Sequence, residues 1–200
     1  MQFTQEEKVE IVDEARNLIM DRHPEVVDVV NGKRQVAMPT GNCVLSSLAM
    51  IEVLIKHNIR AIIQAGSCLW RYKPDECSGV THFGWVYGDN EPIPQQLSHK
   101  ARLKGLLPEL HVWVAIPDSL EIVDIETARF PHVAKNMIGV QWDESLLPPD
   151  FLWTSQDKVM WELDCSYMPS MEAIQEVLEF VKLGKAGEFK IKYLKSKEDN

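Results

Sequence analysis

Three residues of the types used in covalent catalysis follow one another along this chain: Cys43, then His111, then Asp124. A thiol can act as a nucleophile, an imidazole can accept and return its proton, and a carboxylate can orient the imidazole. The order nucleophile, base, orienter therefore supplies the groups that thiol-based acyl transfer requires. The elements that carry these residues must bring them to one place.

Cys43 precedes a strongly apolar segment and is predicted to occupy the first turn of a helix over residues 42–57. Apolar residues cover more than one face of that segment, which is typical of a buried, central helix. A thiol at a helix N-terminus faces the positive end of the helix dipole, which stabilises a thiolate. The unpaired amides of the first turn could also stabilise an oxyanion. The second donor is left open among Gln35, Asn42 and Trp113.

His111 opens one predicted strand, residues 110–116, and Asp124 lies near the end of the next, residues 120–125. An even number of loop residues places both side chains on one sheet face. A type I turn with Pro117 at its second position then sets His111 directly opposite Asp124. Opposed residues have Cβ atoms roughly 4.5–5.5 Å apart, which allows an imidazole–carboxylate hydrogen bond. An odd loop would turn Asp124 to the other face, and we therefore predict the even loop.

Other elements follow from local patterns. A capping box formed by Thr4 and Glu7 begins an amphipathic helix that runs to about Met20, before Pro24. Residues 24–41 look irregular, and residues 130–169, rich in Pro and Trp, are placed only coarsely. The connection over residues 91–108 is polar, basic and long, as in functional lids or mobile loops. Further predicted elements are strands at 61–65, 81–87 and 189–194, and a helix at 171–183.

Composition limits the classes of function. The chain has 200 residues, 45% of them hydrophobic, and a formal net charge of −9, which argues against general binding to nucleic acid or anionic lipid. It contains no apolar run long enough to span a bilayer and no signal-peptide pattern at its start. Four irregularly spaced cysteines fit reduced thiols better than a disulfide framework. We expect a cytoplasmic protein without membrane association, whose oligomeric state the sequence leaves open.

Residues 40–127 resemble the transglutaminase-like branch of the papain-like cysteine protease superfamily. The resemblance is carried by Gly41-Asn42-Cys43 before its helix, by the following strand that ends in Gly66, by His111-Val112-Trp113-Val114, and by Asp124-Ile125-Glu126-Thr127. These segments are similar to the family's Gly-x-Cys helix, its next strand, its His-x-Trp-x strand and its Asp-Pro-Thr element, although the Pro is missing here. The expected organisation is one transglutaminase-like domain over residues 1–200, with a core at about 40–127, an N-terminal helix and a C-terminal extension.

The resemblance implies an α+β fold in which the nucleophile helix packs against an antiparallel sheet. It also implies a catalytic triad: Cys43 attacks an amide carbonyl, His111 transfers the proton, and Asp124 fixes the imidazole. The expected activity is that of a cysteine peptidase, an amidase or a transglutaminase-like acyltransferase acting on a peptide or protein substrate. Hydrolysis is favoured, because an amine-acceptor site has no visible signature. We expect no cofactor and no metal.

Other interpretations stay open. His82 also opens a predicted strand and is a rival base, although no acidic partner of obvious register accompanies it. Cys68, Cys77 and His82 could bind zinc, but their spacing is not a standard one. Cys43 could simply be a small core residue. The chain would then be a non-catalytic module of the same fold that binds a protein partner.

Overall fold

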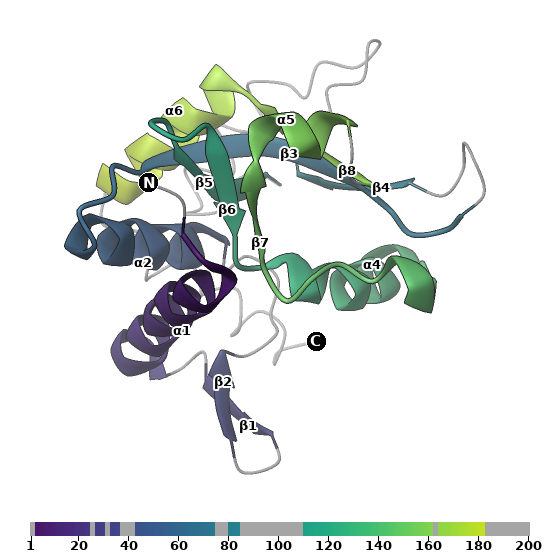
Figure 1. The fold of residues 1–200 in the computed structure, drawn as a ribbon. Coiled ribbons are helices and arrows are strands. Elements are labelled where there is room, and N and C mark those ends of the chain that lie inside the picture. Colours follow the sequence, from purple (N-terminus) through teal and green to yellow (C-terminus); the bar gives the residue numbers. More distant parts are fainter. Residues whose placement is uncertain are drawn as a thin grey trace.

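The protein has an α+β fold built on one six-stranded antiparallel sheet that curls around its helices (Figure 1). The computed structural model describes residues 3–24, 27–30, 33–36, 43–74, 80–84, 110–161 and 164–182. Among these residues, no helix is long and apolar enough to cross a membrane. The predicted strand at 189–194 and the connection at 91–108 lie outside the described residues.

The first helix, α1, spans Gln5–Arg22 and begins as the sequence predicts. The Thr4 side chain accepts a hydrogen bond from the backbone of Glu7, and the Glu7 carboxylate accepts one from the backbone of Thr4. The capping box is therefore confirmed, and the helix continues two residues beyond the expected end at Met20. Pro24, which cannot extend a helix, lies just past the C-cap residue His23.

The second helix, α2, spans Cys43–Lys56 and packs against α1 and strand β5 (Figure 1). Its buried positions include Val44, Met50, Val53 and Leu54, which lie on more than one face. The predicted central helix is confirmed. Because this helix is fixed on several sides, the residue at its first position has a defined place in the molecule.

Residues 24–41 contain a small hairpin, where the sequence analysis expected irregular structure. Strand β1, Val27–Val30, pairs antiparallel with β2, Lys33–Val36. The sequence between them is Asn-Gly, the dipeptide that favours two-residue hairpin loops. That expectation was therefore wrong, because a turn signal between two short runs containing Val predicts a hairpin.

Strand β3, Ile62–Arg71, is the centre of the sheet and pairs with three strands. Its first half pairs with β5, His111–Ile116, and its second half pairs with β4, Val80–Gly84. The short strand β8, Cys165–Pro169, also runs along β3. Gly66 has both His111 and Pro169 as partners, so β5 and β8 flank β3 on opposite sides.

The predicted strand at 61–65 is too short, because Gly66 does not end it. A Cβ atom at Gly66 would lie 2.1 Å from the backbone oxygen of Met168 in β8. Glycine at this position therefore allows a third strand to approach closely, and the chain stays extended as far as Arg71. A glycine inside a strand pattern signalled close backbone contact here, not a boundary.

The hairpin of β5 and β6, Glu121–Asp124, has an even loop, but its register differs from the prediction. Ile116 pairs with Glu121, so four residues, 117–120, form the loop. Leu120 adopts a left-handed conformation at φ 54° and donates from its backbone to Pro117 at 3.4 Å. Continued by one residue, this register sets Trp113, not His111, opposite Asp124. The predicted direct pairing is wrong, but the shift by two residues leaves His111 and Asp124 on the same face.

Few local sequence signals predict the structure of the region after β6. This region contains the 3-10 helix Thr127–Arg129, α4 at Phe130–Ile138, the 3-10 helix Glu144–Leu146, β7 at Leu152–Ser155, α5 at Gln156–Trp161, β8, and α6 at Met171–Lys182. Strand β7 extends the sheet beyond β6. Helix α6 confirms the predicted helix at 171–183 to within one residue.

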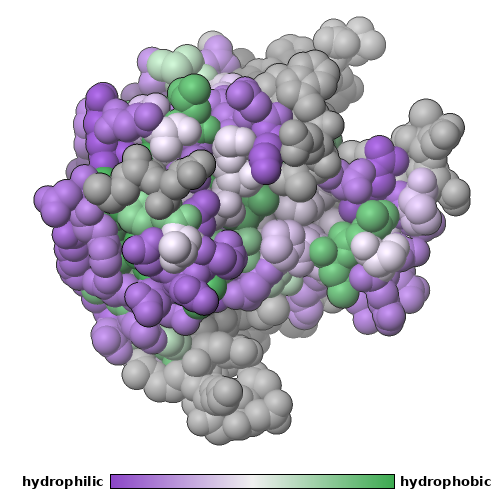
Figure 2. All heavy atoms as spheres, viewed as in Figure 1, coloured by the Kyte–Doolittle hydropathy of each residue, from purple (hydrophilic) through white to green (hydrophobic). Residues whose placement is uncertain are grey.

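The sheet separates two hydrophobic regions. Helices α1, α2 and α6 pack against the face that carries Val112 and Val114. Helices α4 and α5 pack against the opposite face, which carries Trp113 and, by strand alternation, His111 and Asp124. The outer surface in the same view is mainly hydrophilic, with scattered hydrophobic residues (Figure 2).

Candidate active site

His111 and Asp124 form a buried hydrogen-bonded pair. The Nε2 atom of His111 lies 2.6 Å from Oδ2 of Asp124, and the two residues are 5% and 2% exposed. They come from the first residue of β5 and the last residue of β6. Because they are diagonal neighbours on one face, the imidazole spans a gap that two short side chains could not bridge.

The Asp124 carboxylate is saturated with donors. The Tyr167 hydroxyl donates to Oδ2 at 2.6 Å, and the backbone N–H of Glu126 donates to Oδ1 at 2.9 Å. Burial raises the pKa of Asp124, but the charge of His111 and the hydrogen bonds from His111, Tyr167 and Glu126 outweigh it and lower the pKa below its usual value. The carboxylate is therefore ionised throughout the neutral range.

The imidazole of His111 carries a proton at neutral pH. Burial lowers its pKa, but the neighbouring Asp124 carboxylate outweighs burial and, with a hydrogen bond to Cys43, raises the pKa to about 10. The ring stacks on Trp113 with centroids 5.9 Å apart and meets the edge of Phe130 at 5.2 Å. These aromatic walls hold the ring in one plane and exclude water from the bond to Asp124.

Cys43 lies on the other side of His111, at the first residue of α2. Its Sγ atom is 3.9 Å from the backbone oxygen of Leu110, and the thiol lies close enough to the His111 side chain to help raise the pKa of the imidazole. Cys43 is half-buried, whereas Cys68 and Cys165 are buried. Burial raises the pKa of Cys68 well above its ordinary value and that of Cys165 to about 12, so neither is suited to be a nucleophile.

A buried polar link joins the helix of Cys43 to the turn that follows Asp124. Ser46, one helical turn after Cys43, donates to Oε1 of Glu126, and Arg129 donates to Oε2 of the same carboxylate at 2.7 Å. Ser46 and Glu126 are 2% and 7% exposed. Since the backbone of Glu126 also donates to Asp124, one residue connects the helix of Cys43 with the Asp124 carboxylate.

The structure thus brings Cys43, His111 and Asp124 together around one imidazole. The rival base His82 lies in β4 opposite Leu69, but its side chain is outside the described residues, as is Cys77 of the zinc alternative. Across the part of the chain that is described, no three His, Cys, Asp or Glu side chains gather to hold a metal ion.

The proposed oxyanion donors are only partly placed. The Gln35 side chain and Asn42 lie outside the described residues. Trp113 is 2% exposed and lies beneath the His111 ring, so the geometry gives it a supporting position.

Sequence reasoning missed Tyr167, Glu126 and Ser46 as members of the site. The strand of Tyr167, five residues long, alternates too briefly to be recognised. Ser46 was visible only as one of two serines, with Ser47, near the start of an apolar helix, and Glu126 only as an acidic residue close to Asp124. A buried polar residue needs a partner, and that was the available signal.

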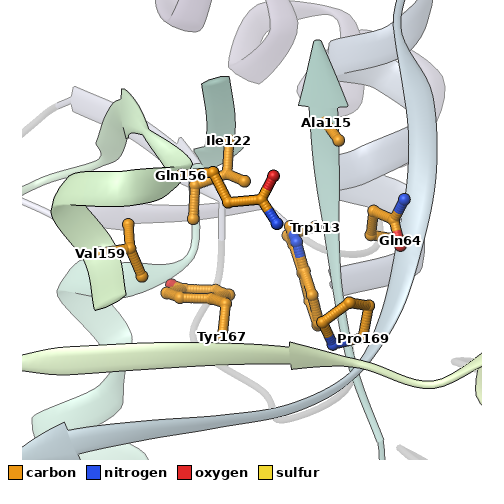
Figure 3. A pocket seen from close by; sticks show the side chains of 8 residues that line it. All are labelled: Gln64, Trp113, Ala115, Ile122, Gln156, Val159, Tyr167 and Pro169. Atoms are coloured by element: carbon orange, nitrogen blue, oxygen red, sulfur yellow. The ribbon is translucent and has the colours of Figure 1, made fainter. Parts of the chain in front are cut away.

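A small cavity of about 30 Å³, partly open to solvent, adjoins the aromatic wall of the site on the same sheet face (Figure 3). Its walls include Trp113, Tyr167, Gln64 and Gln156. The ring of Tyr167 lines the cavity, while its hydroxyl end points away from Trp113 (Figure 3). Cys43, His111 and Asp124 do not line this cavity. It therefore borders the support of the site and not the thiol.

Comparison with known proteins adds little. No protein-family model and no curated protein matches this chain. A crystal structure described as that of genomics APC5867 aligns with 94% of this chain and 76% of its own, at 11% sequence identity and a TM-score of 0.43. Similarity this low indicates neither a family nor an activity.

Proposed function

We propose that this protein is a cysteine hydrolase or acyltransferase of the transglutaminase-like branch of the papain-like superfamily, acting on amide bonds of peptides or proteins. The observation that carries the proposal is the buried His111–Asp124 pair, with its 2.6 Å hydrogen bond, beside the half-buried thiol of Cys43. A helix that starts with the nucleophile and packs on antiparallel strands β3 and β5 supports the papain-like core.

In the proposed reaction, the thiol proton of Cys43 is carried by His111, and the resulting thiolate attacks the carbonyl carbon of the amide and forms a tetrahedral intermediate. The backbone N–H of Cys43, at the start of α2, would stabilise the developing oxyanion. His111 enters as an imidazolium, because its pKa is raised to about 10, and gives its proton to the leaving amine. The C–N bond breaks, the amine leaves, and a thioester remains on Cys43.

A water molecule completes the cycle in the hydrolytic reaction. His111, now neutral, takes a proton from the water as its oxygen attacks the thioester, and the C–S bond breaks to release the acid. The proton on His111 and the thiolate of Cys43 are thereby restored. An amine in place of water would give transfer. We propose hydrolysis in the cytoplasm, where the free thiols Cys43, Cys68 and Cys165 would stay reduced.

The proposal is tested by measuring the rate at which iodoacetamide alkylates each cysteine between pH 5 and pH 9, with peptide mass spectrometry as the readout. We expect Cys43 to react rapidly at pH 6. In His111→Ala that rate should drop by about tenfold or more, because the imidazolium that stabilises the thiolate is gone.

Cys68 and Cys165 serve as controls within the same sample. Both are buried and should remain unmodified in the folded protein, so that their modification would indicate unfolding. If Cys43 is inert at every pH in the folded wild type, the chain is not a thiol enzyme. A protein-binding module of the same fold then becomes the better interpretation.

A further inference from the structure

Tyr167 occupies a position that the proposed reaction does not yet explain. It belongs to β8, far along the chain from the triad, and donates its hydroxyl hydrogen to Asp124. Its ring packs edge-on against Trp113 at 5.1 Å and Trp70 at 6.4 Å. Packing accounts for an aromatic ring at this place. It does not account for a hydroxyl directed at the one carboxylate of the triad.

We propose that Tyr167 is a positioning residue that limits how tightly Asp124 holds the proton of His111. The inference rests on the proposed function, because it assigns Tyr167 a part in proton transfer during acyl transfer. Its basis is geometric: the Tyr167 hydroxyl and His111 Nε2 both lie 2.6 Å from the same oxygen, Oδ2 of Asp124.

Two donors on one carboxylate oxygen share its negative charge. Each donor partly neutralises the field felt by the other, so the bond to His111 is weaker than it would be with Asp124 alone. The other oxygen, Oδ1, already accepts from the backbone of Glu126, which prevents the carboxylate from turning to separate the two donors. The hydroxyl of Tyr167 therefore acts directly on the His111–Asp124 bond.

Tyr167 is also a constant donor. Burial, and after it the negative charge of Asp124, raise the pKa of its phenol well above the ordinary value, so the hydroxyl keeps its proton in any physiological pH range. Its position is fixed by strand pairing, because Tyr167 lies opposite Cys68 of β3. The close approach of β8 to Gly66 holds that pairing in place.

The consequence for the reaction is a more acidic imidazolium: the Nε2 proton stays hydrogen-bonded to Asp124, and the proton on the other ring nitrogen is the one that His111 releases. His111 must give its proton to the leaving amine, and an imidazolium held only by an unshared, buried carboxylate gives it up reluctantly. By taking part of the charge of Asp124, Tyr167 makes His111 a stronger acid while the pair stays intact. Loss of the hydroxyl would slow the acid step without removing the nucleophile.

The test is the NMR resonance of the proton on His111 Nε2 in protein labelled with ¹⁵N-histidine, compared between wild type and Tyr167→Phe. We expect the resonance to move downfield in Tyr167→Phe, because the unshared Oδ2 draws the proton more strongly. Tyr72→Phe is the matched control. It removes a phenol hydroxyl from a ring packed on Trp142 and should leave the resonance unchanged.

An unchanged or upfield resonance in a folded Tyr167→Phe protein would overturn the inference, since a ring that only packs has no reason to strengthen the bond. If Tyr167→Phe does not fold, wild-type protein containing 3-fluorotyrosine replaces it. The more acidic phenol is a stronger donor, so the His111 resonance should move upfield, and no movement would overturn the inference. The resonance reports on the pair alone, so the inert-Cys43 outcome that defeats the proposed function remains a separate result.

Discussion

The two sides of the His111 imidazole are built differently. On one side, Asp124 is 2% exposed and accepts hydrogen bonds from His111, Tyr167 and the backbone of Glu126. On the other side, Cys43 is half-buried at a helix end, with the His111 ring and a backbone oxygen as its neighbours. The carboxylate side is closed and fully hydrogen-bonded, whereas the thiol is only partly buried. In the proposed reaction, this difference would hold the imidazole firmly and leave the thiol partly accessible.

Removing the carboxylate should have the largest effect on this contrast. Asp124→Ala leaves a buried imidazole and a buried phenol hydroxyl without their acceptor, so we expect a loss of about 3–5 kcal/mol in the free energy of unfolding. Urea denaturation measures this loss. Asp150→Ala is the matched control, because its carboxylate pairs with Arg16 at the surface and should contribute little. A small effect of Asp124→Ala would mean that the closed side is not a structural anchor.

Removing the Ser46–Glu126 hydrogen bond, which links the helix of Cys43 to the turn after Asp124, should have a smaller effect on the free energy of unfolding. Ser46→Ala removes the donor to buried Glu126 and should lower the free energy of unfolding by about 1.5–3 kcal/mol. It should also slow alkylation of Cys43, since α2 loses its tie to the turn after Asp124. Ser47→Ala, at a buried neighbour on the same helix, controls for loss of a serine as such. Equal losses of unfolding free energy in both variants would show that the Ser46–Glu126 hydrogen bond contributes no more to stability than the other buried serine does.

A substitution that displaces β8 tests whether the His111–Asp124 hydrogen bond depends on this distant strand. Gly66→Ala would force a Cβ against the backbone oxygen of Met168, and we expect a loss of about 1–3 kcal/mol. Since Tyr167 lies one residue from Met168, the His111 resonance should shift as well. Gly139→Ala is a control without steric overlap, although its φ of 68° carries its own strain. A destabilised Gly66→Ala protein with an unaltered resonance would separate β8 from the site.

The free energy of unfolding should also depend on pH, with opposite contributions from His111 and Asp124. The pKa of His111 is raised in the folded state to about 10, so its contribution to stability is complete below pH 6.5 and is lost as pH rises through 10. The slope should approach no more than about 1.4 kcal/mol per pH unit. Asp124, whose pKa is lowered, contributes in the opposite sense, and its contribution disappears only in acid. Urea titrations of wild type and His111→Gln between pH 6 and pH 10 check this, and parallel curves would contradict it.

The features that could be predicted from the sequence are those that local patterns of residues determine. The capping box at Thr4, the apolar helix after Cys43 and the strand parity of His111 and Asp124 were all predicted, because each depends on neighbouring residues. The hairpin register was missed by two residues because Leu120 adopts a left-handed conformation that few non-glycine residues take.

Tyr167 could not be predicted for a different reason. Its place depends on pairing between β8 and β3, which are separated by about a hundred residues of chain, and on a close approach that only Gly66 permits. A strand of five residues with one small side chain and one proline carries little intrinsic preference. Long-range pairing decided its structure, and with it the fourth member of the site.

The pairing of β3 with β4, β5 and β8 also bears on the order in which the site can assemble during folding. Contacts between segments so far apart are slow to form during folding, because a long loop of chain must close first. The helix of Cys43 can form early from local interactions, but the carboxylate acquires its last side-chain donor only when β8 docks. In a partly folded chain, the helix of Cys43 could therefore be present while Asp124 still lacks the hydrogen bond from Tyr167. Under the proposed function, this topology would delay full reactivity until β8 has paired with β3.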